Sequence, residues 1–390
     1  MRTRINIRIG GALLALALGA AAPARAVDAP AAPAPEPVEP STVFTSYGEI
    51  NYNRPTRPSE AQIDLRRFVL GFQHRFDERT KVVTELEVEH AVSSASDQGE
   101  VEIEQAFVEH QFGAVWAGRA GLFLIPAGLL NEHHEPTAYY GVERNFVETA
   151  IIPSTWREGG IEAVGAFASG LTLQAGLCTT MDLNKWDATS DEGRLSPLGS
   201  IHQELQLARA HDLAGFLALD WRGVPGLQLG GSVFAGDSTQ GQPATGRAVI
   251  VLWDVRARWT PGRLDLSALY TRGTISGTAA FNTPLAADPA NTTLVPAAFD
   301  GWYVQAAYRV WSRGDLGLSP FARWEEFDTG RSYAALGPGL TTPAALPVQA
   351  VATAGLSLDV TAGVVVKADA QWFREDHTQN RIDLGLGWSF

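Results

Sequence analysis

The chain has 390 residues, of which 45% are hydrophobic and 19% charged, with 30 basic residues against 43 acidic ones. This acidic balance argues against a nucleic-acid partner, because such proteins use basic surfaces to displace counterions from phosphates. Cys178 is the sole cysteine, which excludes an intrachain disulfide, and a lone thiol in a strand is expected to be inert.

Residues 1–26 have the pattern of a secretory signal peptide. A start with three arginines precedes a small apolar run over residues 9–24, and Ala24-Arg25-Ala26 supplies a small-x-small cleavage site. An uncleaved membrane anchor is the alternative, but the run is short and rich in Ala and Gly. Cleavage would leave 26 basic and 43 acidic residues, hence a net charge of −17.

The mature chain is expected to begin with a flexible tether. Residues 27–40 are dominated by Ala and Pro and have little to bury. No comparable linker follows, so residues 41–390 are predicted to form one domain.

Alternation with a period of two is the main signal from residue 41 onward, and the final segment shows it most clearly. There Ile382, Leu384, Leu386, Trp388 and Phe390 alternate with Arg381, Asp383, Gly385, Gly387 and Ser389. A period of two places the two sets on opposite faces of a strand. Sixteen such strands are predicted, at 43–54, 61–76, 80–92, 100–112, 116–124, 158–167, 170–182, 207–221, 225–236, 247–260, 263–273, 300–311, 315–326, 348–360, 363–375 and 380–390.

The predicted connections alternate strictly between short and long. Seven short ones lie at 77–79, 113–115, 168–169, 222–224, 261–262, 312–314 and 361–362, whereas several of the others exceed twenty residues. After the signal peptide no apolar stretch approaches the roughly 18 residues of a membrane helix. Short turns at one end and long loops at the other are typical of a transmembrane β-barrel, which satisfies its backbone inside lipid by closing. The fold class is therefore predicted to be all-β, a sixteen-stranded antiparallel transmembrane barrel. Tryptophans of interfacial girdles are expected at Trp253, Trp259, Trp302, Trp324, Trp372 and Trp388.

Charged residues on the strands are assigned to the lumen, since charges facing lipid are strongly destabilising. The predicted pore wall has an acidic part, Glu85, Glu87, Glu89, Glu102 and Glu104, and a basic part, Arg256, Arg258, Arg309, Arg323, Lys367 and Arg381. For any single position, the favoured interpretation is a solvated lumen residue that helps to hold the shape of the lumen.

The longest predicted connection, residues 125–157, carries familiar motifs. NEHHEP at 131–136, GVERNFVE at 141–148 and IIPSTWREGG at 151–160 follow one another between the fifth and sixth strands. In this order they resemble the phosphate-selective porin O and P family of outer-membrane proteins, and a looser likeness extends over residues 41–390. The resemblance implies a trimeric, sixteen-stranded barrel whose third external loop folds inward and narrows the pore. The terminal LGLGWSF, with Trp388 and Phe390, resembles the signal that such barrels present to their assembly machinery.

Selectivity is the point on which the chain departs from that family. Its anion-selective members depend on an arginine ladder and a lysine cluster, but this chain has only Lys81, Lys185 and Lys367. The predicted constriction residues are Glu132, His133, His134, Glu135, Glu143, Arg144, Glu148 and Arg157. Counting residues 125–158 with Glu158 gives a net charge of −3, which favours cations.

The sequence thus predicts an outer-membrane porin for small hydrophilic solutes and ions, with a phosphate or polyphosphate channel as the alternative. Expected partners are outer-membrane lipids, the assembly machinery and two further copies of the chain. No cofactor or metal is expected, because the neighbours Glu132-His133-His134-Glu135 seldom converge on one ion. An enzyme is not expected either, since no G-x-S-x-G motif frames a nucleophile. A barrel that acts mainly as an enzyme or an adhesin is the less favoured class.

Overall fold

A computed structural model describes residues 41–94, 96–97, 99–242 and 246–390. The predicted signal peptide and tether lie outside these residues. Within the described part, no helix is both long enough and apolar enough to cross a membrane.

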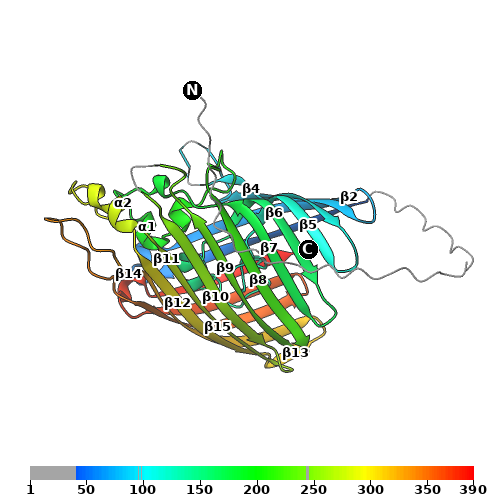
Figure 1. Cartoon of the computed structure of the whole chain (residues 1–390). Coiled ribbons are helices and arrows are strands. Elements are labelled where there is room, and N and C mark those ends of the chain that lie inside the picture. Colours follow the sequence, from blue (N-terminus) through cyan, green and yellow to red (C-terminus); the bar gives the residue numbers. More distant parts are fainter. Residues whose placement is uncertain (1–40, 95, 98, 243–245) are drawn as a thin grey trace, which may run out of the picture. The chain divides into compact units, whose positions relative to one another are not determined.

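The domain is a single antiparallel sheet that closes on itself (Figure 1). Apart from β12 and β13, each strand pairs with its neighbours in the chain, and β1 completes the circle by pairing with both β2 and β17. The strands are β1 (Ser41–Pro55), β2 (Gln62–Arg75), β3 (Thr80–Glu89), β4 (Val101–Gln111), β5 (Trp116–Leu124), β6 (Arg157–Ala166), β7 (Leu171–Thr179), β8 (Leu213–Val224), β9 (Leu227–Asp237), β10 (Val249–Trp259), β11 (Leu264–Ile275), β12 (Ala298–Tyr308), β13 (Trp311–Arg313), β14 (Leu316–Ser332), β15 (Gln349–Thr361), β16 (Val364–Phe373) and β17 (Arg381–Ser389).

The seventeen segments occupy sixteen positions around the barrel. β12 and the three-residue β13 both pair with β14, so they form one barrel strand that is interrupted at residues 309–310. The predicted sixteen-stranded antiparallel barrel is therefore confirmed.

Several predicted boundaries were wrong, and three of the differences have a local reason. The strand predicted at 207–221 begins at Leu213, because Gln203 holds the preceding segment as a loop by donating to the carbonyls of Thr180 (2.6 Å) and Arg209 (3.0 Å). The strand predicted at 80–92 ends at Glu89, since the next two residues have φ values of 55° and 60°. Arg157, predicted in a loop, is the first residue of β6.

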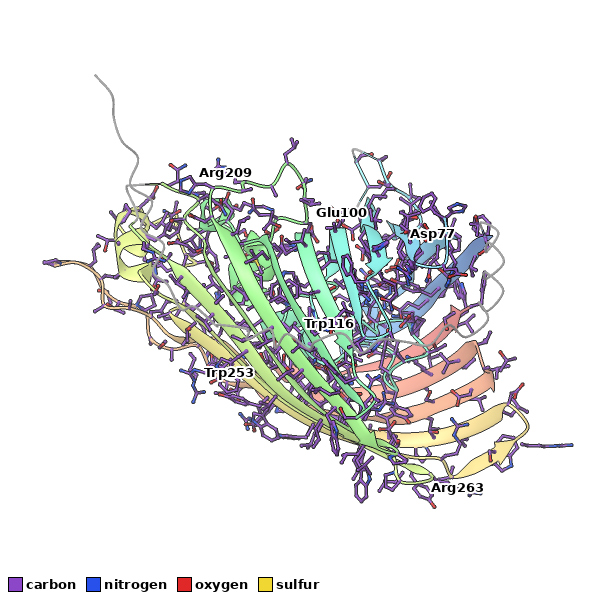
Figure 2. All side chains as sticks on the ribbon, turned by 45° about the vertical axis from the view of Figure 1, so that its right-hand side comes forward. Asp77, Glu100, Trp116, Arg209, Trp253 and Arg263 are labelled. Atoms are coloured by element: carbon purple, nitrogen blue, oxygen red, sulfur yellow. The ribbon has the colours of Figure 1, made fainter. Side chains whose placement is uncertain are left out.

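The two ends of the barrel differ as the connection lengths predicted. Four of the short turns contain a glycine with φ between 60° and 81°, a left-handed conformation that glycine adopts without strain; these are Gly170, Gly226, Gly262 and Gly314. The long connections at the other end contain the helices α1 (Glu192–Leu195) and α2 (Thr278–Leu285) and the short turns of helix η1 (Pro58–Glu60), η2 (Val147–Ile151), η3 (Leu183–Lys185), η4 (Gly199–Ile201) and η5 (His377–Gln379). Figure 2 shows Arg209, in a long connection, and Arg263, in a short turn, at opposite ends of the barrel.

The outer face is apolar and the inner face carries the charges. Val255 is 52% exposed on the outside, whereas its neighbours Asp254 and Arg256 are 3% and 5% exposed and point inward. The same contrast separates Val366 from Lys367 and Leu384 from Asp383. All six predicted girdle tryptophans are at least partly exposed, and Trp388 also packs over Gly48 of β1.

Candidate pore and its internal loop

The connection between β5 and β6, residues 125–156, folds into the barrel and is here called the internal loop. Its backbone amides at Val142 and Phe146 donate to Asp369 of β16 (2.7 Å) and to Glu325 of β14 (2.6 Å). Tyr303 of β12 donates to Glu148 of the loop (2.7 Å). These strands are far from β5 and β6 around the barrel, so the loop crosses the lumen, as the resemblance implied.

One asparagine closes the base of the internal loop. The Asn131 side-chain amide donates to the carbonyls of Ile125 and Trp156 (both 2.7 Å), and its oxygen accepts from the Trp156 amide (2.7 Å). All three residues are buried, so these bonds are shielded from water. The two ends of the loop are thereby held together where it leaves and rejoins the wall.

The Glu148 carboxylate holds several parts of the internal loop together. Its carboxylate accepts from the amides of Leu129 (2.6 Å) and Leu130 (2.8 Å), from Asn145 Nδ2 (3.1 Å) and from Tyr303 Oη. Burial raises the pKa of Glu148, although the four donors favour the ionised form. A carboxylate so fully occupied holds the loop together and has no free oxygen for a passing ion.

His134 fastens the loop to the part of the wall formed by β1 and β4. Its Nδ1 donates to the Asn131 carbonyl (2.8 Å), and its Nε2 lies 3.3 Å from Glu104 and 2.7 Å from Tyr47 Oη. Burial disfavours the charged ring, but the Glu104 carboxylate outweighs burial, so the pKa of His134 lies above its ordinary value. The pair is an ion pair between loop and barrel whenever the ring is protonated.

An apolar core fills one side of the barrel beneath the long connections. Trp156 is fully buried and meets Phe234 of β9 at 4.7 Å between ring centroids, and Phe123 meets Phe216 of β8 at 5.9 Å. Inward residues of β10, Ile250 and Leu252, join the same cluster. Side chains from the internal loop and from the β7–β8 connection complete it, so this part of the lumen is closed to water.

A polar cavity of about 750 Å³ lies on the other side, between the internal loop and β1–β3, β16 and β17. Its charged lining is balanced, with four acids, Glu49, Glu60, Glu89 and Glu143, and four arginines, Arg66, Arg67, Arg144 and Arg381. It is the candidate entrance to the pore.

The residues of the predicted basic wall are ion-paired or hydrogen-bonded and do not form a row of free cations. Each arginine named in it has a carboxylate partner: Arg256 binds Asp220 (2.5 Å) and Asp254 (3.0 Å), Arg258 binds Asp265 (2.6 Å), Arg309 binds Asp359, Arg323 binds Glu325 (2.9 Å), and Arg381 binds Asp383 (3.0 Å). Lys367 donates to the Gly141 carbonyl (2.9 Å) and lies 3.7 Å from the centre of the Tyr139 ring. Paired cations of this kind hold the loop and wall in place and give little net attraction to an anion.

The acidic wall faces inward as predicted, but only part of it meets the polar cavity. Glu87 and Glu104 are 2% and 0% exposed beneath the loop, Glu85 accepts from Gln105, and Glu102 pairs with Arg157 (2.5 Å). Glu89 alone of the five lines the polar cavity.

The constriction residues of the loop are likewise dispersed. Glu132 accepts from Gln174 (2.8 Å), His133 is exposed, and Glu135 is half-buried. Only Glu143 and Arg144 line the polar cavity, where their charges cancel. The expectation that a net charge of −3 acts at one place is therefore wrong, because most of these carboxylates are bonded elsewhere in the lumen.

The sequence did not single out Arg66, which lines the polar cavity beside Arg67. Glu49 pairs with Arg67 and Ile50 pairs with Leu65, so Arg66 is the extra residue of a β-bulge. A bulge allows two consecutive side chains to face the same side, which the period of two does not predict. The doublet Arg66-Arg67 inside an alternating segment was the available signal.

Comparisons with known proteins agree with this architecture. An uncharacterized protein of Aquifex aeolicus (strain VF5) is 28% identical over 355 residues, which make up 88% of this chain and 79% of that protein. Among solved structures, Salmonella typhi OmpF in complex with daunomycin has a TM-score of 0.61 at 13% identity, over 90% of this chain and 97% of OmpF. An anion-selective porin from Comamonas acidovorans has a TM-score of 0.54 at 11% identity, over 90% of this chain and all of that one. The chain has a porin fold. At these identities the likeness establishes the fold alone, and no protein-family model matches, so membership of the phosphate-selective family stays a prediction.

The expectation that the chain is not an enzyme is corrected by a further match. A loop-deletion variant of Vibrio cholerae OmpT, an outer membrane protein, has a TM-score of 0.55 at 9% identity, over 90% of this chain and 99% of OmpT. A fold can host both transport and catalysis. The absence of a G-x-S-x-G motif therefore does not exclude an enzymatic function.

Proposed function

We propose that the protein is an outer-membrane porin through which small hydrophilic solutes diffuse passively. The observation that carries this proposal is the reversal of polarity across one closed sheet, apolar outside and charged inside. Soluble proteins rarely expose so extensive an apolar surface, whereas a barrel in lipid requires it. A closed barrel also leaves no backbone group unpaired in the membrane.

The internal loop supports a sieving role within this proposal. It crosses the lumen, is fastened to walls on several sides, and leaves a polar cavity lined by charges in equal number. Such a loop limits the size of the solutes that pass through the pore and exposes them to fixed charges.

Insertion and assembly follow from the same proposal. The C-terminal strand closes the barrel, where Phe390 and Ser46 exchange backbone hydrogen bonds (2.9 and 3.0 Å), while the Phe390 ring is 77% exposed. We assign Trp388 and Phe390 to recognition by the assembly machinery, after export by the predicted signal peptide. A homotrimer is proposed because one similar structure, of Vibrio cholerae OmpT, is described as a trimer form.

A phosphate or polyphosphate channel receives less support from the lumen. The arginines that would form its ladder are ion-paired, and Lys367 is buried against Tyr139. A general pore with weak charge selectivity fits the paired arrangement better.

Planar-bilayer recordings test the proposal. Purified protein should give discrete conductance steps in KCl without added substrate. Adding phosphate should not change the ion selectivity of the current. Heat-unfolded protein serves as the control. A correctly folded barrel that inserts but gives no steps would contradict the porin function.

A further inference from the structure

We propose that the polar cavity is a binding site for zwitterionic amino acids, so that the porin is selective for solutes that carry one positive and one negative charge. This inference rests on the proposed porin function, since it names the class of solute. It starts from four charged side chains of the cavity that the fold leaves without an ionic partner.

Two of the four are arginines. Arg144 donates to the hydroxyls of Ser154 (2.6 Å) and Thr155 (3.0 Å), which orient its guanidinium group without neutralising it. Arg66, on the bulge of β2, is exposed in the same cavity. Among the described residues, neither arginine forms an ion pair with a carboxylate. This sets them apart from the paired arginines of the barrel wall.

The other two are carboxylates. Glu143 accepts from the side-chain amides of Asn53 (3.1 Å) and Asn51 (3.4 Å), and Glu89 projects from β3. In the part of the chain that the structure describes, neither carboxylate has a Lys or Arg partner. Their oxygens remain available to an ammonium group.

The four groups form two neighbouring sets of opposite charge. Arg66 and Glu89 extend from the paired strands β2 and β3, where the backbone of Glu89 pairs with that of the next residue, Arg67. Glu143 and Arg144 are consecutive in the internal loop, but the carboxylate is held by Asn53 and the guanidinium group by Ser154. A cation-binding site would have an excess of acids and an anion-binding site an excess of bases. Opposite charges in equal number and without ion-pair partners match a solute that has a carboxylate and an ammonium group a few bonds apart, because guanidinium binds carboxylate bidentately and a carboxylate accepts from ammonium.

The remaining lining suits a solute with an apolar side chain. Tyr139, Phe146 and Phe373 contribute aromatic rings to the cavity. Its volume of about 750 Å³ lies within the range usual for small-molecule sites.

Three probes that differ in charge but share one side chain test the inference. L-Phenylalanine carries both charges, N-acetyl-L-phenylalanine only the negative one, and L-phenylalaninamide only the positive one. Binding to the full-length protein in detergent is measured by calorimetry, and the reduction of KCl current by each probe is measured in bilayers. L-Phenylalanine should bind saturably and reduce the current. The two derivatives should bind more weakly by a factor of about ten or more.

Four variants then assign the charges. Arg66→Gln and Arg144→Gln should each weaken L-phenylalanine binding about tenfold while leaving the amide unaffected. Glu89→Gln and Glu143→Gln should each weaken L-phenylalanine binding about tenfold and leave the binding of the N-acetyl derivative unchanged. Arg313→Gln, in the exposed β13 outside the cavity, is the matched control and should bind like the parent.

The outcomes separate this inference from the proposed function. A channel that conducts KCl but binds all three probes equally, or none, overturns the inference and leaves the porin function intact. Protein that binds L-phenylalanine with the expected charge dependence but gives no conductance supports the site and contradicts the porin function.

Discussion

The two sides of the barrel interior differ in what their inward residues do. On one side, at the ends of β8–β12 near the long connections, inward positions carry Phe216, Phe234, Ile250 and Leu252. They belong to one buried cluster with Trp156 of the internal loop, which contacts Phe234. On the other side, β1–β3 and β14–β17 direct charged and amide groups inward. The difference shows how a barrel wide enough for a pore is narrowed: a hydrophobic core fixes the loop, and the polar side is left for solutes.

The apolar side should be the more sensitive to truncation. Trp156→Ala removes a fully buried ring from the core, and such changes typically cost about 3–5 kcal/mol of unfolding free energy. Reversible urea unfolding in detergent measures this cost. Leu207→Ala, at a side chain 99% exposed in the β7–β8 connection, is the control and should be neutral. Equal stability of both variants would show that the core does not hold the loop.

Loss of the Glu148 carboxylate should have the next largest effect on the internal loop. Glu148→Ala leaves four donors without their acceptor, including the amides of Leu129 and Leu130. Each unsatisfied buried donor costs about 1–3 kcal/mol, less where water enters. The variant should conduct more current than the parent and should be cleaved within residues 125–156 by added protease. Glu143→Ala, whose partners are two asparagine amides, should leave protease resistance unchanged. Equal cleavage rates for Glu148→Ala and Glu143→Ala would contradict the role of Glu148 in holding the loop together.

The His134–Glu104 pair should make the loop sensitive to pH. Because the folded-state pKa of His134 lies above its ordinary value of about 6.5, the pair stabilises fully below that value. The stabilisation is lost as the pH rises through the folded-state pKa. The melting temperature in detergent should therefore fall over this window in the parent, and less in His134→Gln. His133→Gln, at the exposed neighbour, should follow the parent, and identical profiles for all three proteins would exclude the pair as the cause.

How far the sequence predicted this molecule depended on the kind of feature. Alternation predicted the strands and the inward charges because period two is a local property, as at residues 381–390. The strand at 249–259 already placed Ile250 and Leu252 on the face of Asp254, which was the signal for an inner apolar core. Ion pairs such as Arg256–Asp220 join different strands, and the bulge at Arg66 breaks the period, so neither follows from spacing along one segment.

Thiol modification at one position on each side of the interior tests the division most directly. Glu143→Cys places a thiol in the polar cavity, whereas Leu252→Cys places one in the apolar core, and the native Cys178 is 1% exposed. Single-channel current is recorded before and after addition of a charged methanethiosulfonate reagent, with the parent protein as control. The current should drop in Glu143→Cys and stay constant in Leu252→Cys and in the parent. A drop in Leu252→Cys with none in Glu143→Cys would contradict a pore that runs along the polar side.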